Sequence, residues 1–159
     1  MNQYETAIRL LCTYMPEEST KPVLLHSIRV GLYLSEKQYS EDIVMAGFLH
    51  DILEDTNITT EEVQNIFGKK VLDLITANTK VKSIVDKIER RKELIKRCVE
   101  SGQDSAIIKA ADILDNYTYY TDLNDENGIE YCRYNTNLFK KYMPKTFSDP
   151  IFEALNSIY

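Results

Sequence analysis

The chain has 159 residues, of which 43% are hydrophobic and 28% charged, and its formal net charge is −6. This composition is typical of a folded globular protein that is long enough to bury a real core in one domain. The negative charge argues against a general electrostatic attraction for nucleic acid, so we expect no nucleic-acid partner. No apolar run approaches the length of a membrane span, so we expect no membrane association. Three scattered cysteines fit a reducing cytoplasm better than a disulfide framework.

Apolar residues recur at helical spacing along the chain, whereas alternating strand-like runs bounded by turn signals are missing. The predicted fold class is therefore all-α: a compact helical bundle that forms a single domain over residues 1–159. The predicted helices cover, in chain order, residues of about 3–15, 19–37, 41–53, 60–67, 70–79, 83–101, 105–120, 129–143 and 149–159.

Several residues mark where these helices begin and end. Pro16 ends the first helix, and Pro22 is expected in the first turn of the second, where its missing N–H costs little. Thr59 and Glu62 have the spacing of a capping box, which predicts a helix start. Gly68 is expected to close that short helix.

The only two histidines, His26 and His50, lie in apolar stretches together with Asp51 and Asp112. A buried ionised carboxylate without a partner is costly, so these four side chains need a shared explanation. Two carboxylates and two neutral imidazoles around a divalent cation form a neutral cluster that an apolar bundle can bury. Mixed nitrogen and oxygen donors favour Mn²⁺ or Fe²⁺, although another divalent cation is also compatible. Four protein ligands leave coordination positions open, which is typical of a catalytic site.

The stretch "HDILEDT" at residues 50–56 places several polar groups at the end of an apolar run. Adjacent helical residues point about 100° apart, so His50 and Asp51 can reach one metal only near a helix end or a distortion. Glu54 and Asp55 follow one helical turn later. We therefore expect this second acidic pair to border the metal pocket.

The chain resembles the HD superfamily of metal-dependent phosphohydrolases, because it has one histidine, then "HD", then a distant aspartate. More narrowly, "FLHDILEDTNITTEEVQNIFGKKVLDLITANTK" is similar to the hydrolase domain of the Rel/SpoT enzymes and their small stand-alone relatives. The resemblance covers about residues 22–120. It implies removal of the 3′-pyrophosphate from the alarmones ppGpp and pppGpp, usually with Mn²⁺, by attack of a metal-bound water.

The resemblance also implies roles for individual residues. The family's metal-ligand positions fall on His26, His50, Asp51 and Asp112. Its catalytic acidic pair falls on Glu54 and Asp55. The segment "IIKAADILDN" is similar to the family's "VKLADRLHN", which places Asn116 on the asparagine that contacts the nucleotide.

The chain departs from the family pattern before the first histidine. The region "LLCTYMPEESTKPVLLHS" lacks the basic residues that help the family hold its guanine nucleotide, and Ser27 replaces a proline. Further along, "KVKSIVDKIERRKELIKR" gathers basic residues. These residues fit a solvated amphipathic helix. Alternatively, Lys80, Lys82 or some of Lys87, Arg90 and Arg91 contact substrate phosphates.

The sequence therefore predicts a cytoplasmic, metal-dependent phosphohydrolase that acts on a nucleotide, with an alarmone as the expected substrate. A different HD activity, such as a nucleoside monophosphate phosphatase, is the alternative enzyme. A non-catalytic nucleotide-sensing module is the alternative from another class. The sequence leaves the oligomeric state open.

Overall fold

The structure, a computed structural model, describes residues 2–15 and 22–158. Every regular element in these two ranges is helical, which confirms the all-α prediction. The chain divides into two units, Met1–Thr79 and Lys80–Tyr159. The single domain over residues 1–159 stays a prediction. Pro16, the expected end of the first helix, lies outside the described residues.

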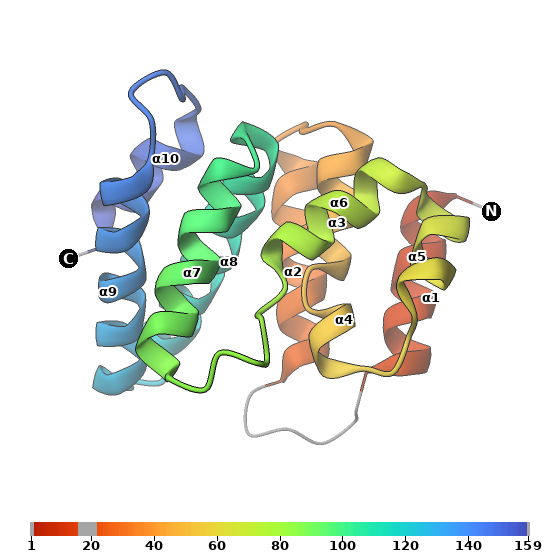
Figure 1. Cartoon of the computed structure of the whole chain (residues 1–159), viewed down its shortest axis with the longest axis horizontal. Coiled ribbons are helices and arrows are strands. Elements are labelled where there is room, and N and C mark those ends of the chain that lie inside the picture. Colours follow the sequence, from red (N-terminus) through yellow and green to blue (C-terminus); the bar gives the residue numbers. More distant parts are fainter. Residues whose placement is uncertain (1, 16–21, 159) are drawn as a thin grey trace. The chain divides into compact units, whose positions relative to one another are not determined.

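The first unit is built around one largely buried helix, which lies among the other helices of the unit (Figure 1). This central helix, α3, packs against α1, α2 and α6, while α5 packs against α6. All seven residues from Ile43 to Leu49 are buried, because the run is apolar all round. The helices of the unit are α1 (Gln3–Tyr14), α2 (Val23–Glu36), α3 (Glu41–Leu49), α4 (Ile52–Asp55), α5 (Thr60–Phe67) and α6 (Lys69–Asn78).

Local signals set most of these boundaries. The capping box of Thr59 and Glu62 is formed at the start of α5, as predicted, and Gly68 closes that helix with φ of 86°. Two predictions were wrong in detail. Pro22 is the N-cap of α2 rather than a residue of its first turn. The helix expected to run on to residue 53 ends at Leu49, and a separate short helix, α4, follows.

Two glycines let α2 and α3 pack unusually close together. A Cβ atom on Gly31 would lie 2.3 Å from the ring of Phe48, and one on Gly47 would lie 2.4 Å from Leu34 Cδ1. Any larger residue would push the two helices apart. This close crossing lies within one to two helical turns of His26 and His50, so we expect it to affect the separation of the histidines.

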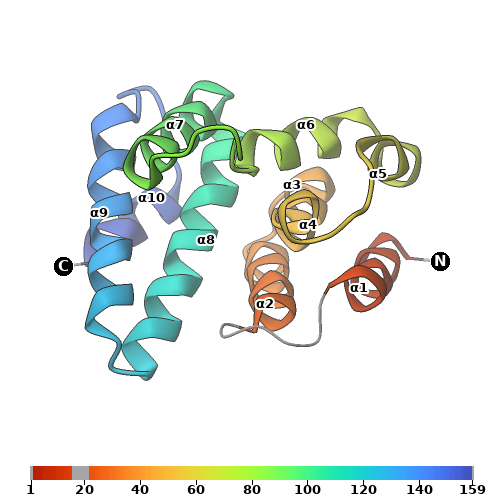
Figure 2. The ribbon, with the colours of Figure 1, turned by 60° about the horizontal axis from the view of Figure 1, so that its bottom comes forward.

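The second unit is a group of three long helices with a short C-terminal segment against them (Figure 2). Its elements are α7 (Lys87–Glu100), α8 (Gln103–Asp122), α9 (Glu126–Tyr142), α10 (Pro150–Ala154) and a 3₁₀ turn (Leu155–Ser157). The helices α7, α8 and α9 pack against one another. The predicted start of α7 at residue 83 was wrong. Asp86 caps the helix by accepting from the backbone N–H groups of Ile88 and Glu89, so the helix begins at Lys87.

The remaining sequence expectations concern membranes and cysteines. None of the described helices combines the length and the apolar character needed to cross a bilayer. The three cysteines are free thiols; Cys98 and Cys132 are buried, and Cys12 is exposed. Burial raises the pKa of the Cys98 thiol to about 11, which makes it a poor nucleophile at neutral pH.

Candidate metal centre and cationic pocket

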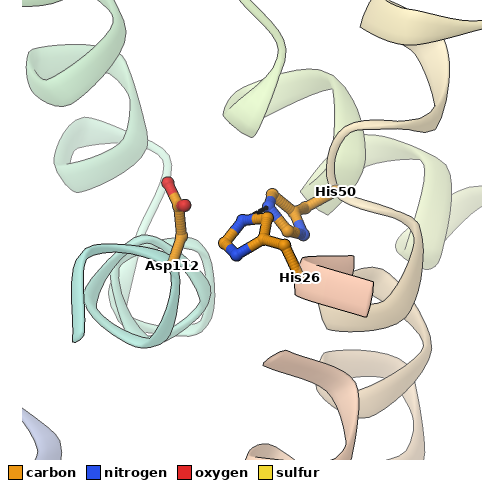
Figure 3. A group of neighbouring side chains, drawn as sticks. All are labelled: His26, His50 and Asp112. Carbon is orange, nitrogen blue, oxygen red and sulfur yellow. Dashed lines mark hydrogen bonds between the residues drawn. The ribbon is translucent and has the colours of Figure 1, made fainter. Parts of the chain in front are cut away.

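The two histidines of the chain face each other inside the first unit (Figure 3). His26 is on α2 and His50 immediately follows α3, and their side chains are 0% and 1% exposed. Their Nε2 atoms are 3.2 Å apart. The rings meet edge to face, with centroids separated by 5.1 Å.

The hydrogen bonding of His50 fixes which of its ring nitrogens can bind a metal. Its Nδ1 lies 2.8 Å from the carbonyl oxygen of Gly47. A carbonyl can only accept, so Nδ1 carries the hydrogen and donates it. In the neutral ring, Nε2 then presents a lone pair toward His26. A backbone carbonyl that fixes the tautomer in this way is a usual partner of metal-binding histidines.

Asp51 brings a carboxylate oxygen to the same place. Its Oδ2 lies 3.3 Å from Nε2 of His50 and 3.8 Å from Nε2 of His26. Asp51 occupies the junction between α3 and α4, with φ of −97° and ψ of −4°. The structure therefore contains the helix break that the adjacent His50 and Asp51 require in order to point at one centre.

These three donors have the spacing that a shared cation would give them. Ligands bound at about 2.1 Å are separated by roughly 3.0–3.4 Å in octahedral or tetrahedral sites. The observed separations of 3.2, 3.3 and 3.8 Å are close to this range. Two imidazoles and a carboxylate, with one tautomer already fixed, fit a divalent transition metal.

The second acidic pair follows at once along the chain. Glu54 and Asp55 lie in α4, and their backbone N–H groups both donate to the carbonyl of Asp51, at 3.0 Å each. Glu54 is partly buried, whereas Asp55 is exposed. Both carboxylates therefore belong to the turn that follows the metal-binding candidates, and solvent can reach Asp55.

In the second unit, Asp112 lies on α8 with both carboxylate oxygens held (Figure 3 draws its side chain). Lys109 Nζ donates to Oδ2 at 2.7 Å, and Asn116 Nδ2 donates to Oδ1 at 2.5 Å. All three residues are buried, at 7–9% exposure. Burial lowers the pKa of Lys109, but the charge of Asp112 more than offsets this, so the net pKa is above its usual range.

The contacts of Asn116 add to its predicted role. The family resemblance implies that Asn116, four residues after Asp112, contacts the nucleotide. Besides the bond to the carboxylate, its Nδ2 lies 2.9 Å from the carbonyl oxygen of Asp112. Asn116 thus fixes the orientation of Asp112, and its contact with a nucleotide stays a prediction.

A cationic pocket of about 130 Å³ opens on the second unit. Its charged lining comes from Lys80, Lys87, Arg90, Arg91 and Lys109. The Arg91 guanidinium lies 4.2 Å from the ring centre of Tyr131, another lining residue, which restrains its direction. Lys82 does not line this pocket and is exposed in the turn before α7.

Sequence reasoning missed two polar residues of this pocket, Lys109 and Asn135. Lys109 interrupts the apolar run "AIIKAADIL" three residues before Asp112. A charged side chain in an apolar run needs a partner, and this argument, which singled out Asp112, applies equally to Lys109. Asn135 comes from α9, and no spacing in the sequence links it to α7 or α8. It is 4% exposed and its Oδ1 has no hydrogen-bond partner among the described residues.

Comparisons with known proteins found a family match and several curated relatives. The HD domain family matches residues 4–141 of this chain. A guanosine-3′,5′-bis(diphosphate) 3′-pyrophosphohydrolase of Borreliella burgdorferi is 38% identical over 106 residues, which cover 64% of this chain and 16% of that protein. The 3′-pyrophosphohydrolase MESH1 of Drosophila melanogaster is 37% identical over 103 residues, which cover 64% of this chain and 56% of that protein. The chain thus spans only part of the length of these curated relatives.

Two solved structures share the helical fold. One, described as a metazoan ortholog of SpoT that hydrolyzes ppGpp, aligns with a TM-score of 0.77 at 22% identity, over 99% of this chain and 94% of that one. A Listeria monocytogenes protein aligns with a TM-score of 0.69 at 25% identity, over 84% of this chain and 94% of that one.

Proposed function

This chain belongs to the HD-domain family, which it matches over residues 4–141, and we propose that it is a metal-dependent phosphohydrolase acting on a nucleotide. The observation that carries the proposal is the buried pair of histidines, with Nε2 atoms 3.2 Å apart and a carboxylate oxygen beside them. The proposed substrates are (p)ppGpp-like alarmones, which would lose their 3′-pyrophosphate. Relatives that carry this activity in their names support the substrate.

The proposed metal ligands are His26, His50, Asp51 and Asp112. The first three converge within the first unit, and Asp112 is added because it matches the last position of the family pattern. The proposed metal is Mn²⁺, with Fe²⁺ or another divalent cation as substitutes, because the donors mix nitrogen and oxygen. A divalent cation held there would lower the pKa of a coordinated water and polarise a phosphoryl oxygen.

Glu54 and Asp55 are the proposed catalytic residues. Hydrolysis joins the oxygen of water to phosphorus and breaks the bond between phosphorus and the ribose 3′-oxygen. The water must lose a proton, and the departing ribose oxygen must gain one. A carboxylate next to the metal ligands can accept the first proton, and its acid form can donate the second. We propose that Glu54 and Asp55 share these two tasks.

The proposed substrate-binding residues are Asn116, Lys80 and Lys82. Lys80 has the strongest support, because it lines a pocket with four more cations, which suits a ligand with several phosphates. Lys82 lies outside that lining, and its role rests on sequence alone. The substrate is expected to be a small molecule in the cytoplasm, bound by one domain over residues 1–159.

The experiment that tests this function is a hydrolysis screen with Mn²⁺ over ppGpp, pppGpp, nucleoside monophosphates and dinucleotides. We expect pyrophosphate to be released from ppGpp, and we expect a chelator or His50→Ala to stop the reaction. Dephosphorylation of a nucleoside monophosphate, with ppGpp untouched, would overturn the alarmone assignment but keep the HD phosphohydrolase. Tight nucleotide binding without turnover of any compound would support a sensing module instead.

A further inference from the structure

The ion pair between Lys109 and Asp112 lies where ion pairs are seldom found. Both side chains belong to α8, at 8% and 12% exposure, and Nζ lies 2.7 Å from Oδ2. Buried ion pairs add little net stability, because desolvation offsets much of the attraction between the charges. Apolar residues would fill this position of the helix at least as well. The pair therefore calls for a functional explanation.

Lys109 also belongs to the cationic pocket. Its side chain lines this pocket together with Lys80, Lys87 and the two arginines of α7. Of these five cations, Lys109 alone is buried. The same ammonium group thus contacts Asp112 and forms part of the pocket wall. It links a proposed metal ligand to a pocket suited to an anion.

A metal at Asp112 would change what surrounds Lys109. The argument rests on the proposed function, in which Asp112 is a ligand. A divalent cation on the carboxylate competes with the ammonium for the negative charge, and the two cations repel each other. Lys109 would then be a buried cation without its counter-charge, which is unfavourable unless another anion replaces it. The pocket provides space for that anion. It is also lined by Asn135, whose Oδ1 has no hydrogen-bond partner among the described residues and could accept a hydrogen bond from an ammonium group in the pocket.

We propose that Lys109 is a positioning residue that couples metal binding at Asp112 to phosphate binding in the cationic pocket. Without metal, Lys109 neutralises Asp112. When metal takes the carboxylate, the ammonium group turns into the pocket and binds a phosphate of the substrate. Because coupling between two binding sites is reciprocal, the anion must strengthen metal binding by the same factor that metal strengthens anion binding.

The test measures Mn²⁺ affinity by calorimetry with and without sulfate, at constant ionic strength and with free Mn²⁺ determined. Sulfate is a tetrahedral divalent oxyanion that cannot be hydrolysed here. For the unmodified chain we expect sulfate to tighten Mn²⁺ binding about tenfold, within the usual range of coupling between sites. Lys109→Met should remove this effect and bind Mn²⁺ more tightly than the unmodified chain when sulfate is absent. If Lys109 had only a structural role, replacing it would instead weaken metal binding.

Two variants serve as controls. Lys109→Arg keeps the charge and should retain part of the coupling. Lys96→Met removes an exposed lysine of α7 that lies outside the pocket lining. This variant should leave the Mn²⁺ affinity unchanged, both with and without sulfate. Melting curves confirm that each variant is folded. If Lys109→Met does not fold, the absence of a sulfate effect in the unmodified chain still refutes the coupling, and an undiminished effect in Lys109→Arg refutes the role of Lys109.

The outcomes separate this inference from the proposed function. Absent Mn²⁺ binding would refute both proposals. Mn²⁺ binding that is unchanged in Asp112→Ala would refute Asp112 as a ligand and with it the coupling, and would leave a metal-dependent hydrolase with the other three ligands. Mn²⁺ binding that depends on Asp112 but is unaffected by sulfate would refute the coupling and leave the metal centre intact. Coupling that persists in Lys109→Met would also refute the role of Lys109.

Discussion

Gly31→Ala is the most informative single change in the first unit, because it tests how α2 and α3 set the histidine pair. The added Cβ would lie 2.3 Å from the ring of Phe48, whereas ordinary contact begins near 3.4 Å. Phe48 is fully buried. We therefore expect the two helices to separate by about 1 Å, which is large beside the 3.2 Å between the two Nε2 atoms.

Overpacking of this kind usually lowers stability by about 1–3 kcal/mol. For a chain of this length we expect the melting temperature to fall by roughly 2–12 °C. We also expect weaker Mn²⁺ binding, because the ligand spacing is lost. The assays are thermal melting followed by circular dichroism and titration with Mn²⁺. Ser35→Ala, on the same helix, is the matched control and should change neither quantity. If Gly31→Ala keeps the melting temperature and the metal affinity, the close helix crossing does not position the histidines.

Three more predictions follow from the other sites. Glu54→Gln combined with Asp55→Asn should retain the metal and lower kcat by at least about 10²-fold, the scale of general acid–base groups. If the double variant releases pyrophosphate as fast as the unmodified chain, both residues have a structural role. Lys80→Ala should raise KM with little change in kcat, and this rise should exceed the one caused by Lys82→Ala, which changes an exposed residue. Equal rises of KM for the two variants in steady-state kinetics would argue against substrate binding in the pocket. The Cys98 thiol, with its pKa raised to about 11 by burial, should react with an alkylating reagent at pH 8 only when the chain unfolds; mass spectrometry that finds rapid labelling of the folded chain would contradict its burial.

The sequence was most informative where polar groups interrupt apolar runs. His26, His50 and Asp112 were selected because a buried polar side chain needs a partner, and all three are buried. The need for a break at His50–Asp51 was predicted from helix geometry alone, and α3 ends one residue before His50. The length of the helix was nevertheless overestimated, because apolar spacing continues across the break and does not reveal it.

Other features could not be predicted because they depend on packing between segments far apart in the chain. Nothing in the sequence pairs Gly31 with Phe48, so the closeness of α2 and α3 was not predictable. The cationic pocket needs Asn135 from α9 beside cations from α7 and α8. Asp86 was a recognisable N-cap residue. The apolar residues before it nevertheless led to a predicted helix that begins too early, on the N-terminal side of this cap.

The metal content of the purified chain tests the central claim most directly. After dialysis against buffer with Mn²⁺ and removal of free metal, elemental analysis should find about one divalent metal per chain. His50→Ala and Asp112→Ala should lose that metal, because each removes a ligand and leaves the remaining charges poorly balanced. Full metal content in either folded variant would contradict the metal centre proposed here.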